Sequence, residues 1–411
     1  MGTVSFLLKA HLYAILAIVI YVAGCFLLAL PEAQRHYLFL HQVRFPFFTK
    51  YHEPHAHGIS PGQARNFYFN STDDVRIGAW HILPESIYET YAQHASEKTP
   101  ELPVEIFEQA LQSHPTFVYL HGNAMNRAAP FRIRTYKDLV HQMNANVIAI
   151  DYRGFGDSQS FPTEEGVIND AYAAIQFVRD HAVNPKTGKS PGLTLMGQSL
   201  GTGVASQCAL RLHREGIHLD ALVLLAPFKS IHPMVAEFRM GGVVPLLGFL
   251  DLFPGKDELI QSLLQYKFDT MSALKELVES STKPDALTAP TILVMHAEND
   301  EVIPVYHAED LYMMAEDTTH AMVKSSPFLV WGSNAPDLGY VRSIMHKSAR
   351  LPERRGLLPG ARFVLPRSAI FTYVRLEKGG HNHLLDYNVD AMQLMLPQYM
   401  TGPGATTSSA K

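Results

Sequence analysis

A serine between two glycines is the first place in this chain where residue types and spacing point to chemistry. The apolar run 193–196 leads into Gly197-Gln198-Ser199-Leu200-Gly201, and residues 202–210 then have the composition of a helix. A strand, a G-x-S-x-G turn and a helix in this order are typical of a nucleophile elbow, where the glycines leave room for a strained serine backbone. The N–H groups at the start of the helix can bind a negatively charged oxygen. We therefore predict that Ser199 is a nucleophile.

A serine hydroxyl needs a general base, and the base needs a carboxylate that orients it. After an elbow of this kind, the carboxylate comes before the histidine along the chain. We predict Asp300 as the carboxylate because it lies a few residues past the apolar run 291–296 and before Pro304. Glu298 and Glu301 are the competing carboxylates.

The predicted base is His381. It is the first histidine after Gly379-Gly380, which follow the strand-like run 371–376. His383 is the alternative, and His346, which lies in a proline-rich stretch, is a third candidate.

The negative charge that develops on a reacting carbonyl oxygen needs two backbone N–H donors. One is the N–H of Leu200, directly after the serine. The other should come from a loop after an earlier strand. His121-Gly122-Asn123-Ala124 follows the apolar run 116–120. Either Asn123 or Ala124 can supply the amide, and we choose Asn123.

The elements around these motifs predict an α/β fold. Strand-like runs alternate with helix-like segments, which indicates a doubly wound, mostly parallel sheet. In such a sheet the ligand site lies beyond the carboxyl ends of the strands, where all four motifs fall. The predicted strands are residues 75–83, 116–120, 146–151, 193–196, 221–227, 291–296 and 371–376.

Four segments follow from this pattern: an N-terminal anchor (1–30), a membrane-proximal connector (31–70), the α/β body (71–400) and a disordered Gly/Ser/Thr-rich tail (401–411). Two insertions interrupt the body. Residues 228–289 are rich in apolar side chains and are positioned to form a lid, which would suit a hydrocarbon tail. The same side chains could instead pack a small core of their own. Residues 318–367 are irregular and proline-rich, and we assign them no function.

The first 30 residues predict a membrane span. No charged residue occurs in residues 10–30, and about 20 apolar residues are enough to cross a bilayer. Small residues at Ala23-Gly24-Cys25 could serve a cleaved signal peptide, but the apolar run is longer than the signal-peptide core usually is. We favour a retained single span. The aromatic residues of the connector could lie at the headgroup level, but we expect them to pack on the body.

The orientation of the span stays open on these residues alone. Lys9 precedes the span whereas Arg35, Arg44 and Lys50 follow it, which favours a cytosolic body. Asn70-Ser71-Thr72 is a glycosylation sequon, which would matter only in a lumenal body.

Composition excludes several functions. The 411 residues carry a formal net charge of −5, which gives no reason to expect a nucleic-acid partner. No H-E-x-x-H motif or Cys/His cluster has zinc spacing. The two cysteines, Cys25 and Cys208, fall in the apolar run and in the helix after the serine, so we expect no disulfide between them.

Taken together, four motifs resemble the membrane lipases with an α/β-hydrolase domain, and in particular the monoacylglycerol and lysophosphatidylserine lipase branch. The motifs are residues 121–124, 151–158, 197–205 and 296–300. The resemblance implies the α/β-hydrolase fold, with Ser199 as nucleophile, Asp300 as acid and His381 as base. It also implies one N-terminal anchor, a body on the lumenal side of the endoplasmic reticulum, and no metal or organic cofactor. The chain departs from the branch at Gln198, where histidine is common, and in the longer stretch before His381.

The predicted function is that of a membrane-anchored serine hydrolase. Its substrates would be carboxylic esters of single-chain lipids, such as monoacylglycerol or lysophospholipid. Two alternatives remain: a protein acyl-thioesterase that uses the same residues, and a catalytically silent scaffold. The sequence leaves open the head group, the acyl length and the oligomeric state.

Overall fold

The computed structural model describes most of the chain. The described residues are 2–92, 102–237, 239–240, 244–245, 247–252, 254–281, 289–325, 341–346 and 371–386, with the single positions 389, 392, 393 and 396. The predicted tail and most of the insertion 318–367 lie outside them. Within them the chain forms two compact units, Met1–Leu40 with Ile231–Lys267, and His41–Ser230 with Phe268–Lys411.

The larger unit is built on a nine-stranded sheet in the described part of the chain, with the strand order β1-β2-β4-β3-β5-β6-β9-β11-β10. The strands are β1 (Ala64–Asn70), β2 (Arg76–Ile82), β3 (Thr116–Leu120), β4 (Asn146–Ile150), β5 (Leu193–Gln198), β6 (Ala221–Leu225), β9 (Thr291–Ala297), β10 (Val341–His346) and β11 (Phe371–Leu376). β2 runs antiparallel to β1 and β4, and the other pairs are parallel. The predicted mostly parallel sheet is therefore confirmed.

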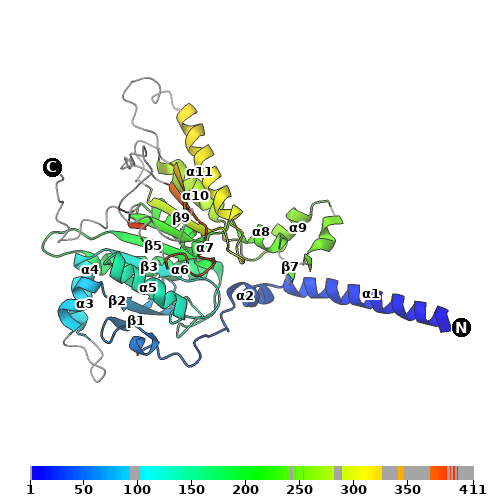
Figure 1. Cartoon of the computed structure of the whole chain (residues 1–411), viewed down its shortest axis with the longest axis horizontal. Helices are drawn as coiled ribbons and strands as arrows, with labels where there is room; N and C mark the ends of the chain where they lie inside the picture. Colours follow the sequence, from blue (N-terminus) through cyan, green and yellow to red (C-terminus); the bar gives the residue numbers. More distant parts are fainter. Residues whose placement is uncertain are drawn as a thin grey trace. The chain divides into compact units, whose positions relative to one another are not determined.

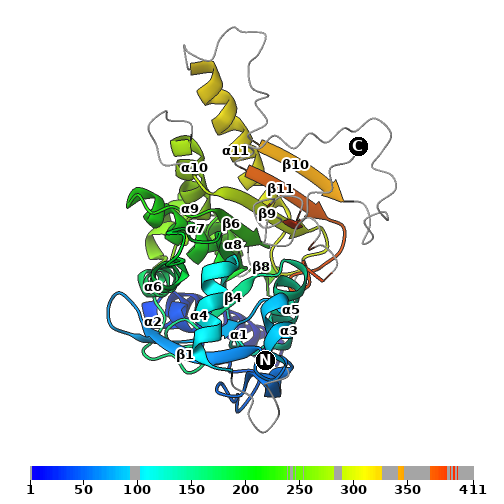
Figure 2. The same cartoon turned by 90° about the vertical axis from the view of Figure 1, so that its left-hand side faces the viewer.

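Helices cover both faces of this sheet. One face packs against α5 (Pro130–Gln142) and the segment after His381, through alternate strand residues such as Tyr119 and Met196. On the other face α6 (Glu164–Ala182), α7 (Leu200–Arg214), α10 (Thr270–Ser281) and α11 (Tyr306–Ser325) pack in succession. Figure 2 shows α10 and α11 beside β9, β11 and β10. Two further helices, α3 (Glu85–Tyr91) and α4 (Val104–Ser113), lie between β2 and β3 in sequence, and η1 (Pro54–His57) precedes β1.

Two strands of this unit, β1 and β10, were not predicted. β1 was assigned to the connector, although its register with β2 runs along all seven of its residues. The stretch read as irregular contains β10 and the end of α11. Both strands lie at sheet edges, where one side of the backbone has no strand partner and periodicity is a weak signal.

The smaller unit joins the N-terminus to part of the predicted lid (Figure 1). It contains α1 (Gly2–Leu28), α2 (Pro31–Phe39), α8 (Ile231–Ala236), β7 (Arg239–Met240), β8 (Val244–Pro245), η3 (Gly248–Leu252) and α9 (Lys256–Leu263). The Gln34 side chain donates to the carbonyl of Leu263 (2.8 Å) and accepts from the N–H of Gln265 (2.8 Å). The ring of Phe39 packs edge-on against Tyr266, with ring centroids 5.2 Å apart. Helix α2 is thus built into the insertion.

Helix α1 has the length and composition of a membrane span. Its residues Leu8–Leu27 have a mean hydropathy of 2.2, and none of this window is buried. Pro31 at the start of α2 separates the two helices, as expected at the first position of a helix.

The expected packing of the connector aromatics is wrong for part of the set. Phe39 is fully buried, but Phe47 is 71% and Phe48 is 100% exposed. Phe48 has a positive φ of 55°, and in this turn its ring lies in solvent instead of against the body.

Candidate active site

Ser199 occupies the turn between β5 and α7. Its backbone has φ 53° and ψ −121°, a region that costs roughly 1–3 kcal/mol for a residue with a side chain. The N–H of Ser199 donates to the carbonyl of Leu225 on the next strand (2.9 Å), which fixes the turn. A Cβ on Gly201 would lie 2.1 Å from the carbonyl oxygen of Leu120, and one on Gly197 would lie 2.2 Å from the carbonyl oxygen of Gly201. Both glycines are therefore required by close backbone approach.

The structure brings the three predicted side chains into one hydrogen-bonded chain. His381 Nε2 lies 2.8 Å from Ser199 Oγ, and His381 Nδ1 lies 2.9 Å from Asp300 Oδ2. These distances are those expected between a nucleophile, its base and the orienting carboxylate. Ser199 is 8% exposed, so it is buried but not fully closed off from solvent.

Asp300 is held as a carboxylate by donors on both oxygens. Oδ1 accepts from the N–H groups of Val302 (2.8 Å) and Ile303 (2.9 Å). Oδ2 lies 3.3 Å from Nε2 of the buried His296 and also accepts from His381. Burial raises the pKa of Asp300, but the hydrogen bonds from His296 and His381 outweigh it and hold the pKa well below its usual value.

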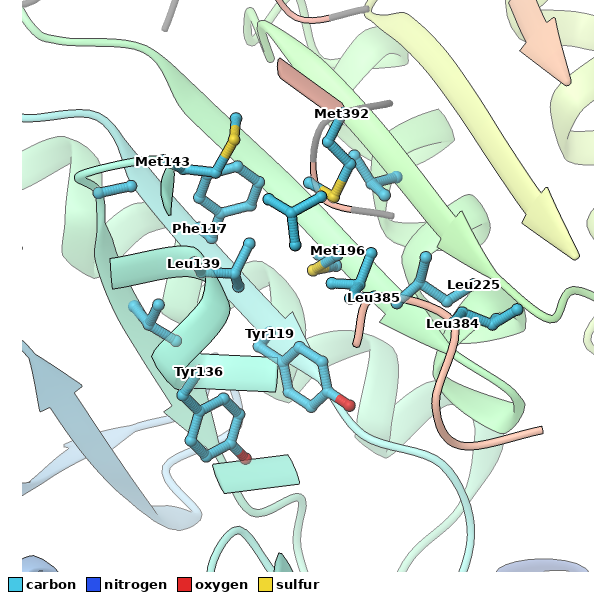
Figure 3. Close-up of a cluster of buried hydrophobic side chains, with 14 of the residues drawn as sticks. Phe117, Tyr119, Tyr136, Leu139, Met143, Met196, Leu225, Leu384, Leu385 and Met392 are labelled. Carbon is cyan, nitrogen blue, oxygen red and sulfur yellow. The ribbon is translucent and has the colours of Figure 1, made fainter. Parts of the chain in front are cut away.

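Gln198 forms hydrogen bonds with the loop that carries His381. The Gln198 amide donates to the backbone carbonyl of His381 (3.2 Å) and to Oδ1 of Asn382 (3.3 Å). Its carbonyl oxygen accepts from the Tyr119 hydroxyl. Just past the histidine, Leu384 and Leu385 pack into the apolar cluster with Tyr119 (Figure 3). The hydrogen bonds of Gln198 and the packing of the two leucines together fix the position of the His381 imidazole relative to the sheet.

The predicted oxyanion loop lies against the serine. A Cβ on Gly122 would lie 3.1 Å from Ser199 Cβ, so the loop can approach only with glycine there. Ala124 and Met125 both have positive φ angles, 57° and 59°. These angles turn the chain sharply just after Asn123.

Arg132, on α5, binds the backbone carbonyl oxygens of this loop. Its guanidinium donates to the carbonyl oxygens of Asn126 (2.8 Å), Ala124 (3.0 Å), Gly122 (3.2 Å) and Asn123 (3.4 Å). The side chain is 1% exposed, and no carboxylate is hydrogen-bonded to it in the described part of the chain. A buried cation bound by four carbonyl oxygens fixes the orientation of the peptide groups that they belong to.

A second buried arginine supports the next turn. Arg127 donates to Asp151 (2.6 Å) and to Asp157 (2.7 Å). Burial raises the pKa of Asp151, but the Arg127 charge together with the hydrogen bond and charge of His121 outweighs it and lowers the pKa below its ordinary value. The motif at residues 151–158 therefore supplies the carboxylates that bind Arg127, and this ion-pair network supports the oxyanion loop.

The residues that competed with Asp300 and His381 in the sequence make other contacts. Glu298 accepts from Arg375 (2.8 Å), and Glu301 is exposed. His383 faces Asp386, with Nδ1 and Oδ2 3.0 Å apart. The side chain of His346 lies outside the described residues. No cluster of three or more His, Cys, Asp or Glu side chains among the described residues could hold a metal ion.

Sequence reasoning missed Arg132, His296 and the role of Gln198. A signal existed for Arg132, because it shares a helical face with Tyr136 and Leu139, which are buried. A charged residue on an apolar face is unusual. The other two contacts depend on which loops meet, which the spacing along the chain does not encode.

The comparisons agree with this architecture. A family model described as the alpha/beta hydrolase fold matches residues 117–305. The lysophosphatidylserine lipase ABHD12 of Danio rerio is 31% identical over 78% of this chain and 76% of that protein. The ABHD12 protein of Rattus norvegicus is 32% identical over 81% of this chain and 75% of its own length. A crystal structure of an α/β hydrolase from Vibrio vulnificus has a TM-score of 0.52 at 12% identity, and covers 89% of this chain and 92% of that one.

The sheet order and the elbow define an α/β hydrolase, and the fold and the relatives make this protein a serine ester hydrolase. More narrowly, the chain belongs to the α/β-hydrolase-domain family of the ABHD12 lysophosphatidylserine lipases.

Proposed function

We propose that this protein is a membrane-anchored hydrolase that cleaves the carboxylic ester of a lipid with one acyl chain, a lysophospholipid or a monoacylglycerol. The observation that carries the proposal is the hydrogen-bonded chain from Ser199 through His381 to Asp300. The substrate class rests on the ABHD12 relatives, which are lysophosphatidylserine lipases.

In the first half of the reaction, Ser199 Oγ attacks the ester carbonyl carbon while His381 Nε2 takes the hydroxyl proton. The carbonyl oxygen becomes negative and accepts from the N–H groups of Leu200 and Asn123. Asp300 stabilises the imidazolium through Nδ1. The bond to the glycerol oxygen then breaks, His381 gives its proton to that oxygen, and the acyl group stays on Ser199.

In the second half, a water molecule attacks the acyl carbon and His381 takes its proton. When the tetrahedral intermediate collapses, the proton returns to Ser199 Oγ and the fatty acid leaves. No cofactor takes part in either half. Catalysis rests on the positions of the nucleophile, the base and the two donors.

We place the body on the lumenal side of the endoplasmic reticulum, with α1 as the anchor. Asn70, the sequon asparagine, is exposed at the end of β1, where an oligosaccharide could be attached. Treatment of the protein expressed in cells with an N-glycosidase should increase its gel mobility, and Asn70→Gln should remove the shift. A wild-type chain that is unaffected by the glycosidase would contradict this placement.

The test of the reaction compares purified wild-type protein with Ser199→Ala. Wild type should release fatty acid from lysophosphatidylserine and monoacylglycerol and react with a fluorophosphonate probe, whereas Ser199→Ala should do neither. A palmitoyl-cysteine peptide, as a third substrate, separates a lipase from a thioesterase. Preferential cleavage of the peptide would overturn the proposed substrate class.

A further inference from the structure

The exposed residues 43–48, which we call the apolar loop, form a surface that the proposed reaction does not use. We propose that this loop is a second membrane contact, inserted at the headgroup level beside the oxyanion loop. The proposal rests on the proposed function for its anchored state and its lipid substrate.

The loop exposes four apolar side chains that lie close together in the sequence. Val43 is 45%, Phe45 39%, Phe47 71% and Phe48 100% exposed. Phe45 and Phe47 pack edge-on, with ring centroids 5.7 Å apart, so their rings form one cluster. Isolated exposed apolar residues are common on soluble proteins, but contiguous aromatic residues mark a contact surface.

This loop is firmly attached to the body. The N–H of Met125 donates to the carbonyl of Val43 (2.7 Å). Thr49 donates to the carbonyl of Pro46 (2.6 Å), and its hydroxyl accepts from the side chain of Asn126 (3.1 Å). The exposed rings are therefore presented on a fixed turn.

Those hydrogen bonds also place the loop next to the active site. Met125 and Asn126 directly follow Asn123 and Ala124, and Arg132 binds the carbonyls of this same segment. A lipid whose head group lies beside the apolar loop would therefore have its ester bond near the oxyanion loop.

Covalent connection and charge favour a bilayer as the occupant of this surface. Residues 29–42, nine of which form α2, are all that separate α1 from the loop. A nine-residue helix is about 14 Å long and extended residues add about 3.5 Å each, so the loop stays within roughly 30 Å of the end of the span. The exposed side chains of Arg44 and Lys50 flank the rings. Aromatic rings with flanking cations match the composition of a membrane–water interface.

The experiment measures depth directly and needs no catalysis. Full-length Phe48→Trp is reconstituted in phosphatidylcholine vesicles with and without brominated chains, which quench tryptophan on contact. The matched control is Val183→Trp. Val183 is 50% exposed and lies between the end of α6 and the start of β5. It is therefore on the side of the sheet where the parallel strands begin, whereas Ser199 is on the side where they end. The wild-type signal, which includes buried Trp80, is subtracted from both.

We expect brominated lipid to quench the added emission of Phe48→Trp at least twofold, and to leave that of Val183→Trp unchanged. Equal quenching of the two variants overturns the proposal. So does an emission change that grows with protein density but not with bromine, because it indicates contact between copies of the chain.

A second measurement links the contact to substrate delivery. In the double variant Phe47→Ser/Phe48→Ser, the ratio of activity on vesicle-borne lysophospholipid to activity on soluble p-nitrophenyl butyrate should fall about tenfold. An unchanged ratio overturns the delivery role. Vesicle flotation of the wild type tests the anchor separately, and lysophospholipid turnover tests the proposed reaction, so failure of either is distinguishable from failure of the loop contact.

Discussion

The amide of Gln198 donates to the backbone carbonyl of His381, so the residue just before the serine holds the loop that carries its hydrogen-bond partner. The two loops come from β5 and from the end of β11, which are separated in the sheet by β6 and β9. A single side chain therefore couples the elbow to the imidazole across two intervening strands.

Gln198→Leu keeps the volume but removes this coupling. The two lost hydrogen bonds to the His381 loop are worth about 1 kcal/mol each, so we expect kcat to fall about thirtyfold. KM should change little, because substrate contacts stay intact. Tyr119→Phe is the matched control, since it removes only the donor to the Gln198 carbonyl oxygen, and its effect should be smaller. Steady-state kinetics on a soluble ester measures both, and an equal loss of kcat in the two variants would argue against the coupling.

The histidine assignment can be tested by paired substitutions. His381→Ala should lower kcat by about 10⁴, because the serine loses its base. His383→Ala removes only an exposed contact with Asp386 and should change kcat less than threefold. Fluorophosphonate labelling rates of the two variants, with circular dichroism as the control for folding, check this expectation. A large loss confined to His383→Ala would reverse the assignment.

Arg132→Lys keeps the positive charge but cannot reach four carbonyl oxygens at once. We expect the oxyanion loop to lose its fixed orientation and kcat to fall about 10²-fold, in the range seen when one oxyanion donor is removed. Arg134→Lys, on the same helix but more than half exposed, is the control. Measurement of kcat, KM and thermal midpoint separates a misplaced donor from general unfolding. A variant with normal kcat would remove Arg132 from any role in positioning the loop.

Asp138 gives a pH-dependent prediction for stability. Burial, followed by the nearby Asp386 charge, raises the pKa of Asp138 to about 6. A carboxyl with a raised pKa in the folded state binds its proton more tightly there, so it lowers stability as the pH rises from about 4 through 6. Asp138→Asn should therefore raise the thermal midpoint by about 2 °C at pH 8, a modest value because the group is half exposed and screened.

This gain should shrink to a small remainder at pH 4, where Asp138 is protonated in the folded state and partly protonated in the unfolded state. Thermal unfolding of wild type and variant at pH 4, 6 and 8 measures the trend. A gain that stays constant with pH would show that titration of Asp138 is not its cause.

Much of this geometry could be predicted because it lies where strands end. Ser199, Asp300 and His381 each lie within a few residues of the end of a buried strand, and parallel strands bring their carboxyl ends to one side of the sheet. The prediction failed where a position depends on contacts between distant segments. Gln34 meets the insertion more than 200 residues later in the chain, and nothing in the local pattern of either segment indicates that contact. Phe48 was expected to pack because aromatic residues usually do, but its ring is fully exposed on a turn with a positive φ, and no local sequence pattern marks that turn.

The contact between Gln34 and the insertion determines how a soluble form of this enzyme should be prepared. A truncated chain beginning after Leu40 would remove both α1 and α2. The carbonyl of Leu263 and the N–H of Gln265 would then lose their partner, and Tyr266 would lose the ring of Phe39. A chain beginning at Pro31 omits α1 but keeps all of these contacts. The start of a truncated enzyme should therefore lie before α2, because helix α2 belongs with the enzyme.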